Sequence, residues 1–176
     1  DLDFTVQMDL VNFEKFIFRI FSSLESEGFK FKPRETIAGK RYLLSNNIPD
    51  STQKLFANLD FSFREKVFEI KNSSITTPLP IVFTSRVCHM SQGEIYAEKI
   101  RAILNREKGR DLYDLWYLST KGTQLDPLML QSKLDYYKQV YSKAELLKKI
   151  SLFDKNQFIL DLRPFVPLGE RNKLGD

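Results

Sequence analysis

The chain of 176 residues has almost no cysteine or histidine, because Cys88 and His89 are the single examples of each. One cysteine permits no internal disulfide and no thiolate metal cluster. One histidine argues against histidine-based zinc sites and Ser-His-Asp triads. Catalytic chemistry in this chain would therefore depend on carboxylates, lysine, arginine or tyrosine.

Long apolar runs are also missing from the sequence. No segment approaches the about 20 residues that a membrane-spanning helix needs, and no signal peptide opens the chain. We therefore expect a cytoplasmic protein without a membrane partner. The sequence starts at Asp1, inside an expected strand and without an initiator methionine, so we expect residues to be missing before it.

The composition is that of a packed protein with a mild positive charge. Hydrophobic residues make up 42% and charged residues 28%, and the net charge is +4. This proportion of apolar residues argues against disorder. The basic excess permits a nucleotide or nucleic-acid partner without requiring one.

Hydrophobic periodicity predicts a small mixed sheet with one helix in the first half of the chain. Residues 1–7 alternate as a half-buried strand does, and residues 13–24 place apolar side chains at helical spacing. Residues 55–63 form the clearest strand, with Asp60 on its polar face. We expect Lys66–Ile70 to extend the sheet and Asn72–Pro80 to form a loop.

The second half reads as helical. Ser91 and Glu94 form a capping-box pattern, the order Asp126-Pro127 marks a helix start, and a tail from Asn156 is expected to end as a loop. The sequence therefore predicts an α+β protein with a sheet core over residues 1–90, incomplete at its N-terminus, and a helical region over residues 91–176.

Three carboxylates on the predicted strands could hold a metal ion. Asp1 and Asp3 project from one face of the first strand because alternate residues share a face. Asp60 would join them if its strand lies beside the first. Mg²⁺ prefers such oxygen ligands together with substrate phosphates, as phosphoryl or nucleotidyl transfer requires. The other interpretation is that these are ordinary solvated side chains, with Asp1 frayed at the chain end.

A second group lies in the segment EIYAEKIRAILNREKGRDLYDLWYL. Lys99 and Arg106 share a helical face, Arg110 follows Gly109, and Asp111 and Asp114 share a face of the next helix. These cations could bind phosphate, and Asp111 could orient one of them or act as a base. Spacing alone favours an elbow between two helices held by surface ion pairs.

The opening DLDF, together with AEKIRAILNREKGRDLYDLWYL, resembles the AbiEii/AbiGii toxin family over residues 1 to about 122. The resemblance implies a DNA polymerase β-like nucleotidyltransferase core with a C-terminal helical half. It also implies a toxin of a type IV toxin–antitoxin and abortive-infection system, with a cognate antitoxin encoded beside it.

The spacing of the residues and this resemblance together give the expected site roles. The resemblance implies that Asp1, Asp3 and Asp60 bind Mg²⁺ or Mn²⁺. Lys99, Arg106 and Arg110 would bind a nucleoside triphosphate, and Asp60, Lys99 and Asp111 would be catalytic. Transfer would be to a hydroxyl of RNA, such as tRNA, or of a protein. The family pattern also has a Gly-Gly-Ser/Thr turn before the D-x-D, and nothing precedes Asp1 here. The alternative is an inert module of the same fold that binds an antitoxin or RNA.

Overall fold

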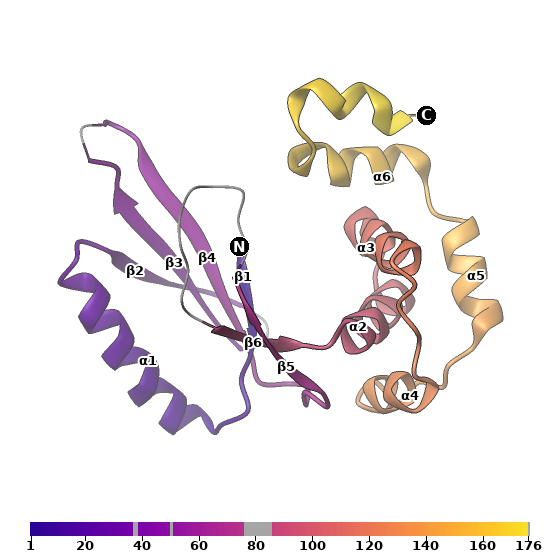
Figure 1. The fold of residues 1–176 in the computed structure, drawn as a ribbon, viewed down its shortest axis with the longest axis horizontal. Coiled ribbons are helices and arrows are strands. Elements are labelled where there is room, and N and C mark those ends of the chain that lie inside the picture. Colours follow the sequence, from indigo (N-terminus) through magenta and orange to yellow (C-terminus); the bar gives the residue numbers. More distant parts are fainter. Residues whose placement is uncertain (37–38, 50, 76–85, 176) are drawn as a thin grey trace. The chain divides into compact units, whose positions relative to one another are not determined.

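The computed structural model describes residues 1–36, 39–49, 51–75 and 86–175. The chain divides into two compact units, Asp1–Val67 and Phe68–Asp176. Together they form the predicted α+β architecture, with a small mixed sheet in the first unit and helices concentrated in the second (Figure 1). The division comes earlier than the expected boundary at residues 90/91, because the segment after Val67 packs with the helices.

The first unit contains a four-stranded sheet in the order β1-β4-β3-β2 and one helix. β1 pairs parallel to β4, and the other neighbours pair antiparallel. β2 is an edge strand, as Pro33 within it predicts. The bounds are β1 Leu2–Thr5, α1 Leu10–Glu25, β2 Lys30–Arg34, β3 Lys40–Asn47 and β4 Lys54–Ser62.

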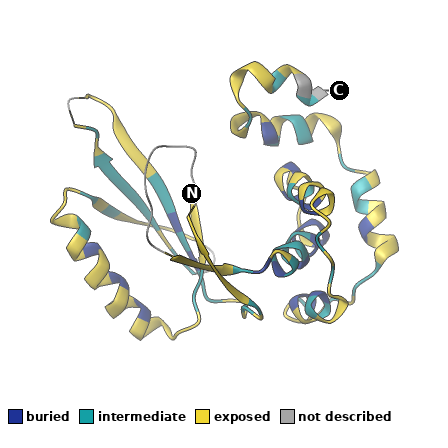
Figure 2. Cartoon of the chain, viewed as in Figure 1, coloured by how far each residue is buried: buried dark blue, intermediate teal, exposed yellow. Residues whose placement is uncertain are grey.

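One face of this sheet packs against α1 and forms the core of the unit. Phe13, Ile17 and Phe21 recur at helical spacing and are buried against Leu59 and Phe61 of β4. Buried positions follow the side of α1 that faces the sheet, as Figure 2 shows. Because side chains alternate along a strand, the residues next to Leu59 and Phe61 project from the opposite face.

The second unit opens with a β-hairpin of β5 Ile70–Ser74 and β6 Arg86–Met90. The prediction that Lys66–Ile70 extends the first sheet was wrong, since β5 pairs only with β6 in the described part of the chain. The expected loop at Asn72–Pro80 was also wrong for residues 72–74, which are in β5, while residues 76–80 lie outside the described residues.

Seven helical segments follow the hairpin in the described part of the chain, and the last two have 3₁₀ geometry. Ser91, Asp126 and Ser142 cap helices as predicted. The expectation that the tail ends as a loop was wrong, because two 3₁₀ segments end the described chain. Before them, Asp154 caps a further helix through the backbone N–H of Gln157. The bounds are α2 Gln92–Asn105, α3 Gly109–Thr120, α4 Pro127–Asp135, α5 Lys143–Ser151, α6 Lys155–Leu162, η1 Arg163–Phe165 and η2 Leu168–Gly175.

The core of the second unit lies between α2, α3, α4 and α5. Its buried side chains come from the apolar faces of these helices. They are Ala97, Ile100, Ile103, Leu104, Leu115, Leu130, Leu134 and Leu146. In the described part of the chain, none of the helices is both long and apolar enough to cross a membrane.

An ion cluster is buried beside this core. Lys133 of α4 contacts Glu94 at 2.6 Å and Glu98 at 2.8 Å, and its side chain is 1% exposed. The Glu94 carboxylate also accepts hydrogen bonds from the backbone N–H groups of Phe68 and Glu69. In a full capping box Glu94 would reach back to the N–H of Ser91. Here it anchors the extended segment just before β5 to α2 instead.

Candidate functional site

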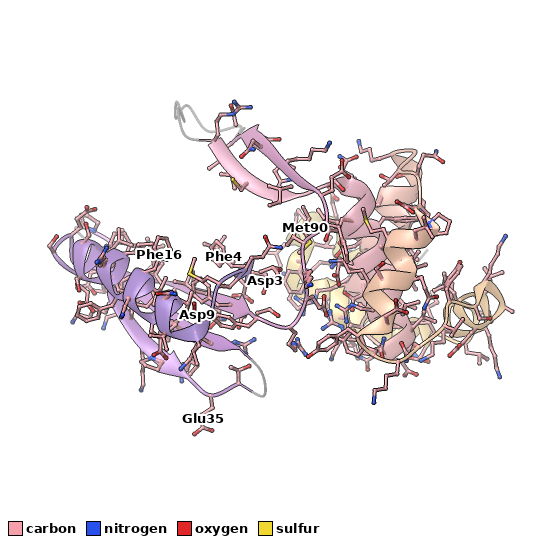
Figure 3. All side chains as sticks on the ribbon, turned by 90° about the horizontal axis from the view of Figure 1, so that it is seen from below. Asp3, Phe4, Asp9, Phe16, Glu35 and Met90 are labelled. Atoms are coloured by element: carbon pink, nitrogen blue, oxygen red, sulfur yellow. The ribbon has the colours of Figure 1, made fainter. Side chains whose placement is uncertain are left out.

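Asp3 and Asp60 are direct neighbours on the face of the sheet that α1 does not cover. They are register partners on the parallel strands β1 and β4. Phe4 lies on the side of β1 toward α1, and Asp3 lies on the other side (Figure 3). The packing of Phe61 against α1 likewise turns Asp60 outward. The alternation of both strands therefore aligns two carboxylates side by side.

Asp1 lies one step further along the same face. Its carboxylate accepts a hydrogen bond of 2.9 Å from the side-chain amide of Asn58, which precedes Asp60 on that face of β4. Among the described residues, no three acidic, histidine or cysteine side chains form a group that could by itself hold a metal ion. The structure therefore brings Asp3 and Asp60 together and gives Asp1 a different partner.

Arg41 completes the row on this face. It is the register partner of Asp60 on β3, and its Nε donates a hydrogen bond to the Asp60 carboxylate. This hydrogen bond, the charge of Asp60 and the charge of Asp3 all raise the pKa of Arg41. Sequence reasoning missed Arg41, because its relation to Asp60 depends on the pairing of two strands.

The second predicted group forms an ion-pair network at the junction of α2 and α3. Lys99 Nζ lies 2.6 Å from Asp114 Oδ2 and 3.4 Å from Asp111 Oδ1. Arg106 binds Asp111 through both Nε, at 2.6 Å, and a terminal nitrogen, at 3.0 Å. The network brings Lys99, Arg106 and Asp111 together, as the spacing indicated.

Asp111 is the buried centre of this network, with its side chain 3% exposed. Burial raises the pKa of Asp111, but the hydrogen bond and charge of Arg106 and the charge of Lys99 outweigh that effect, so the pKa is lowered. An ionised carboxylate that accepts hydrogen bonds from two cations is a weak base. The Asp111 carboxylate contacts both Lys99 and Arg106, so it can hold these two side chains in position.

Arg110 lies apart from these ion pairs. Its guanidinium sits over the ring of Phe165, 4.6 Å from the centroid. Arg110 and Phe165 line a cavity of about 340 Å³ in the second unit, together with Tyr113 and Asp114 among others.

Gly109 fixes the position of Arg110 and Asp111 at the start of α3. Its N–H donates a hydrogen bond of 2.7 Å to the Asp161 carboxylate of α6. A Cβ atom at this position would lie 3.0 Å from the backbone of Phe158, so glycine allows an approach of the two helices that a larger residue would strain. Asp161 was missed from the sequence because α6 was not predicted.

Comparison with known families and structures now adds to this geometry. The family model described as "Nucleotidyl transferase AbiEii toxin, Type IV TA system" matches residues 1–173. This chain belongs to the AbiEii family. Comparison with curated proteins finds no match. Among solved structures, the chain is similar to JHP933 from Helicobacter pylori, with 19% identity, a TM-score of 0.49, and coverage of 98% of this chain and 71% of that chain.

The protein is accordingly an AbiEii nucleotidyl transferase toxin of a type IV toxin–antitoxin system, for which an antitoxin is the expected partner. The resemblance stated from the sequence is thereby confirmed at the level of the family. The roles of individual AbiEii residues remain predictions.

Proposed function

We propose that this toxin transfers a nucleotide from a nucleoside triphosphate to a hydroxyl of RNA, such as tRNA. The observation that carries the proposal is the alignment of Asp3 and Asp60 on neighbouring strands. Two adjacent, solvent-accessible carboxylates, completed by substrate phosphates, suit Mg²⁺ or Mn²⁺. When bound by Asp3 and Asp60, with Asp1 nearby, such an ion would supply positive charge to the reacting phosphate.

The transfer itself is a displacement at phosphorus. The acceptor hydroxyl oxygen forms a bond to the α-phosphorus, the bond from that phosphorus to the bridging oxygen breaks, and pyrophosphate leaves with the electron pair. The hydroxyl proton passes to solvent. The protein contributes mainly by positioning the reactants and stabilising negative charge.

The cations of the second unit suit the triphosphate. Lys99, Arg106 and Arg110 would bind phosphate oxygens, and Arg106 retains the exposure that this requires, with its side chain 61% exposed. Asp111 would act through Lys99 and Arg106 as a positioning residue. We do not assign it the role of a base, because its lowered pKa disfavours proton uptake near neutral pH.

Nucleotide transfer is tested with purified toxin, RNA and each of the four nucleoside triphosphates labelled at the α-phosphate. We expect labelled RNA to form in the presence of Mg²⁺ or Mn²⁺ and to be absent with a chelator. Asp60→Asn and Asp3→Asn should each abolish labelling, whereas Glu25→Gln, an exposed carboxylate at the end of α1, should not. Unchanged labelling by the Asp60→Asn protein would refute the assignment.

The alternative is that the protein is an inert module that binds an antitoxin or RNA. The pairing of Arg41 with Asp60 favours this alternative, because it satisfies the carboxylate without a metal ion. Thermal unfolding distinguishes the two functions. A rise in midpoint with one nucleotide and Mg²⁺, lost on chelation, supports the enzyme, and no shift with any nucleotide supports the module.

A further inference from the structure

We call the face of the sheet that α1 does not cover the open face. Its charged side chains change from acidic to basic from β1 to β2. Residues opposite each other in the ladder read Asp3, Asp60, Arg41 and Arg34, from β1 to β2. Two carboxylates are thus followed by two guanidinium groups in a single row.

β2 extends the positive charge along the sheet edge. Lys30, Lys32 and Arg34 alternate with Phe31, which stacks on Phe21 of α1, so the three cations project from the open face. All three are exposed, and in the described part of the chain no carboxylate forms an ion pair with them. Their spacing is about 7 Å, since alternate residues of a strand are two rises apart.

An exposed aromatic ring lies on the same face. Phe56 of β4 is opposite Ser45 of β3, which in turn is opposite Lys30 of β2. Its side chain belongs to the face of Asp60, four residues away and about 13 Å along the strand. Phe56 is 63% exposed, so the face of its ring is accessible to a ligand.

We propose that this face, made by Lys30, Lys32, Arg34, Arg41 and Phe56, binds a single-stranded segment of RNA and leads its end to Asp3 and Asp60. A row of cations beside an exposed aromatic ring is the combination that binds single strands, because phosphates contact the cations and an unpaired base stacks on the ring. A duplex offers no free base face to Phe56. The proposal rests on the proposed function, for which it identifies the acceptor surface.

Charge is tested first, by fluorescence anisotropy with a labelled single-stranded RNA of about twelve nucleotides. The variant Lys30→Glu/Lys32→Glu is compared with Lys15→Glu/Arg19→Glu, which makes the same change of net charge on exposed positions of α1. We expect the first variant to bind about tenfold or more weakly and the second to change less than about twofold. Equal losses would show that net charge alone governs binding and would overturn the proposal.

The salt dependence of RNA binding is an independent measure of the contacts between the β2 lysines and RNA phosphates. Each lost phosphate contact lowers the slope of log K against log salt by about 0.7 for a single strand. Lys30→Ala/Lys32→Ala should therefore lower the slope by about 1.4 units. An unchanged slope would mean that these lysines do not contact phosphate.

Stacking is tested with Phe56→Ala against Phe18→Ala, because Phe18 is a ring of α1 that is even more exposed, at 71%. Phe56→Ala should weaken binding of the single strand by about tenfold, with little effect on a duplex of the same sequence. Phe18→Ala should change neither. Equal affinity of Phe56→Ala and wild-type protein for the single strand would remove the ring from the proposal.

The labelling assay separates this inference from the proposed function. Suppose that the toxin labels RNA and that the β2 and Phe56 variants bind and label RNA as well as the wild type does. The proposed RNA-binding face is then refuted, and the proposed nucleotide transfer is supported. If the variants lose RNA binding but neither they nor the wild type transfers a nucleotide, the RNA-binding face is supported and the proposed activity is refuted.

Discussion

Arg41 of β3 binds the carboxylate of Asp60, its register partner on β4. The guanidinium therefore occupies the side of Asp60 opposite Asp3, and the charges of both carboxylates stabilise its protonated form. A divalent cation held by Asp3 and Asp60 would have to compete with this internal cation. The strength of the Arg41–Asp60 ion pair should therefore affect how tightly Asp3 and Asp60 bind a metal ion.

The first prediction concerns this competition. Replacing Arg41 by alanine removes the internal cation, so the free protein should bind Mn²⁺ several-fold more tightly, as measured by titration with electron paramagnetic resonance. Lys40→Ala is the matched control, because Lys40 lies next to Arg41 and pairs instead with Glu14 of α1 at 2.8 Å. Unchanged or weaker Mn²⁺ binding by Arg41→Ala would contradict the competition.

The second prediction concerns the network around Asp111. Asp111→Asn removes a buried carboxylate that accepts charge-assisted hydrogen bonds from Arg106 and Lys99, and should lower the free energy of unfolding by about 2 kcal/mol. Asp114 pairs with Lys99 at the surface, so Asp114→Asn should cost only about 0.5 kcal/mol. Urea denaturation followed by Trp116, the single tryptophan of the chain, reports on the second unit. Equal costs for both variants would contradict the central position of Asp111.

The third prediction is the pH dependence of that difference. The pKa of Asp111 is lower in the folded chain than in the unfolded one, so its contribution is complete above the ordinary aspartate value of about 4 and is lost as the pH falls through the lowered value. The gap in unfolding free energy between wild type and Asp111→Asn should stay constant near neutral pH and close in acid. Other carboxylates are common to both proteins and cancel. If the difference in unfolding free energy between the two proteins instead grew below pH 4, the pKa of Asp111 would be raised by folding, which would contradict its ion pairs.

The sequence predicted β1 and β4 because their alternation is local, and it predicted the caps at Ser91, Asp126 and Ser142 for the same reason. It did not predict the pairing of β1 with β4, which alone places Asp3 beside Asp60, since register is set by packing against α1. The charge gradient of the open face follows from the same register.

Other features were missed for different reasons. α6 has a readable signal, because Asp154 and Gln157 have the spacing of a capping box, but the prolines that follow suggested a loop. Lys133 has no such signal. A lysine on a short helix indicates a solvated face, and only the packing of α4 on α2 buries it between Glu94 and Glu98.

The fourth prediction concerns the close approach of α3 to α6. Gly109→Ala would place a methyl group 3.0 Å from the backbone of Phe158 and 3.1 Å from Asp161 Cβ. The backbone of Phe158 cannot move aside as easily as the end of a flexible side chain could. The free energy of unfolding, measured by urea denaturation, should therefore fall by about 1–3 kcal/mol. Gly169→Ala, where a Cβ atom would have no neighbour within 4 Å, is the control and should change stability by less than about 0.5 kcal/mol. Wild-type stability of Gly109→Ala would mean that the two helices separate at no cost.

The fifth prediction concerns the buried ion cluster of α2 and α4. Lys133→Met leaves the fully buried Glu94 without a cation, whereas Glu98 keeps Arg101, and the uncompensated charge of Glu94 should lower the free energy of unfolding by about 3 kcal/mol or more. Lys143→Met, at an exposed position of α5, should change it by less than about 0.5 kcal/mol.

A double-mutant cycle with Glu94→Gln isolates the pairing within this cluster. Removing the charge of Glu94 also removes the penalty for its isolation, so the double variant should be more stable than the sum of the single losses indicates, by more than about 1 kcal/mol. Glu94→Gln alone should still be destabilising, because the N–H groups of Phe68 and Glu69 then face a weaker acceptor. Strict additivity would show that Lys133 and Glu94 are buried side by side without energetic coupling.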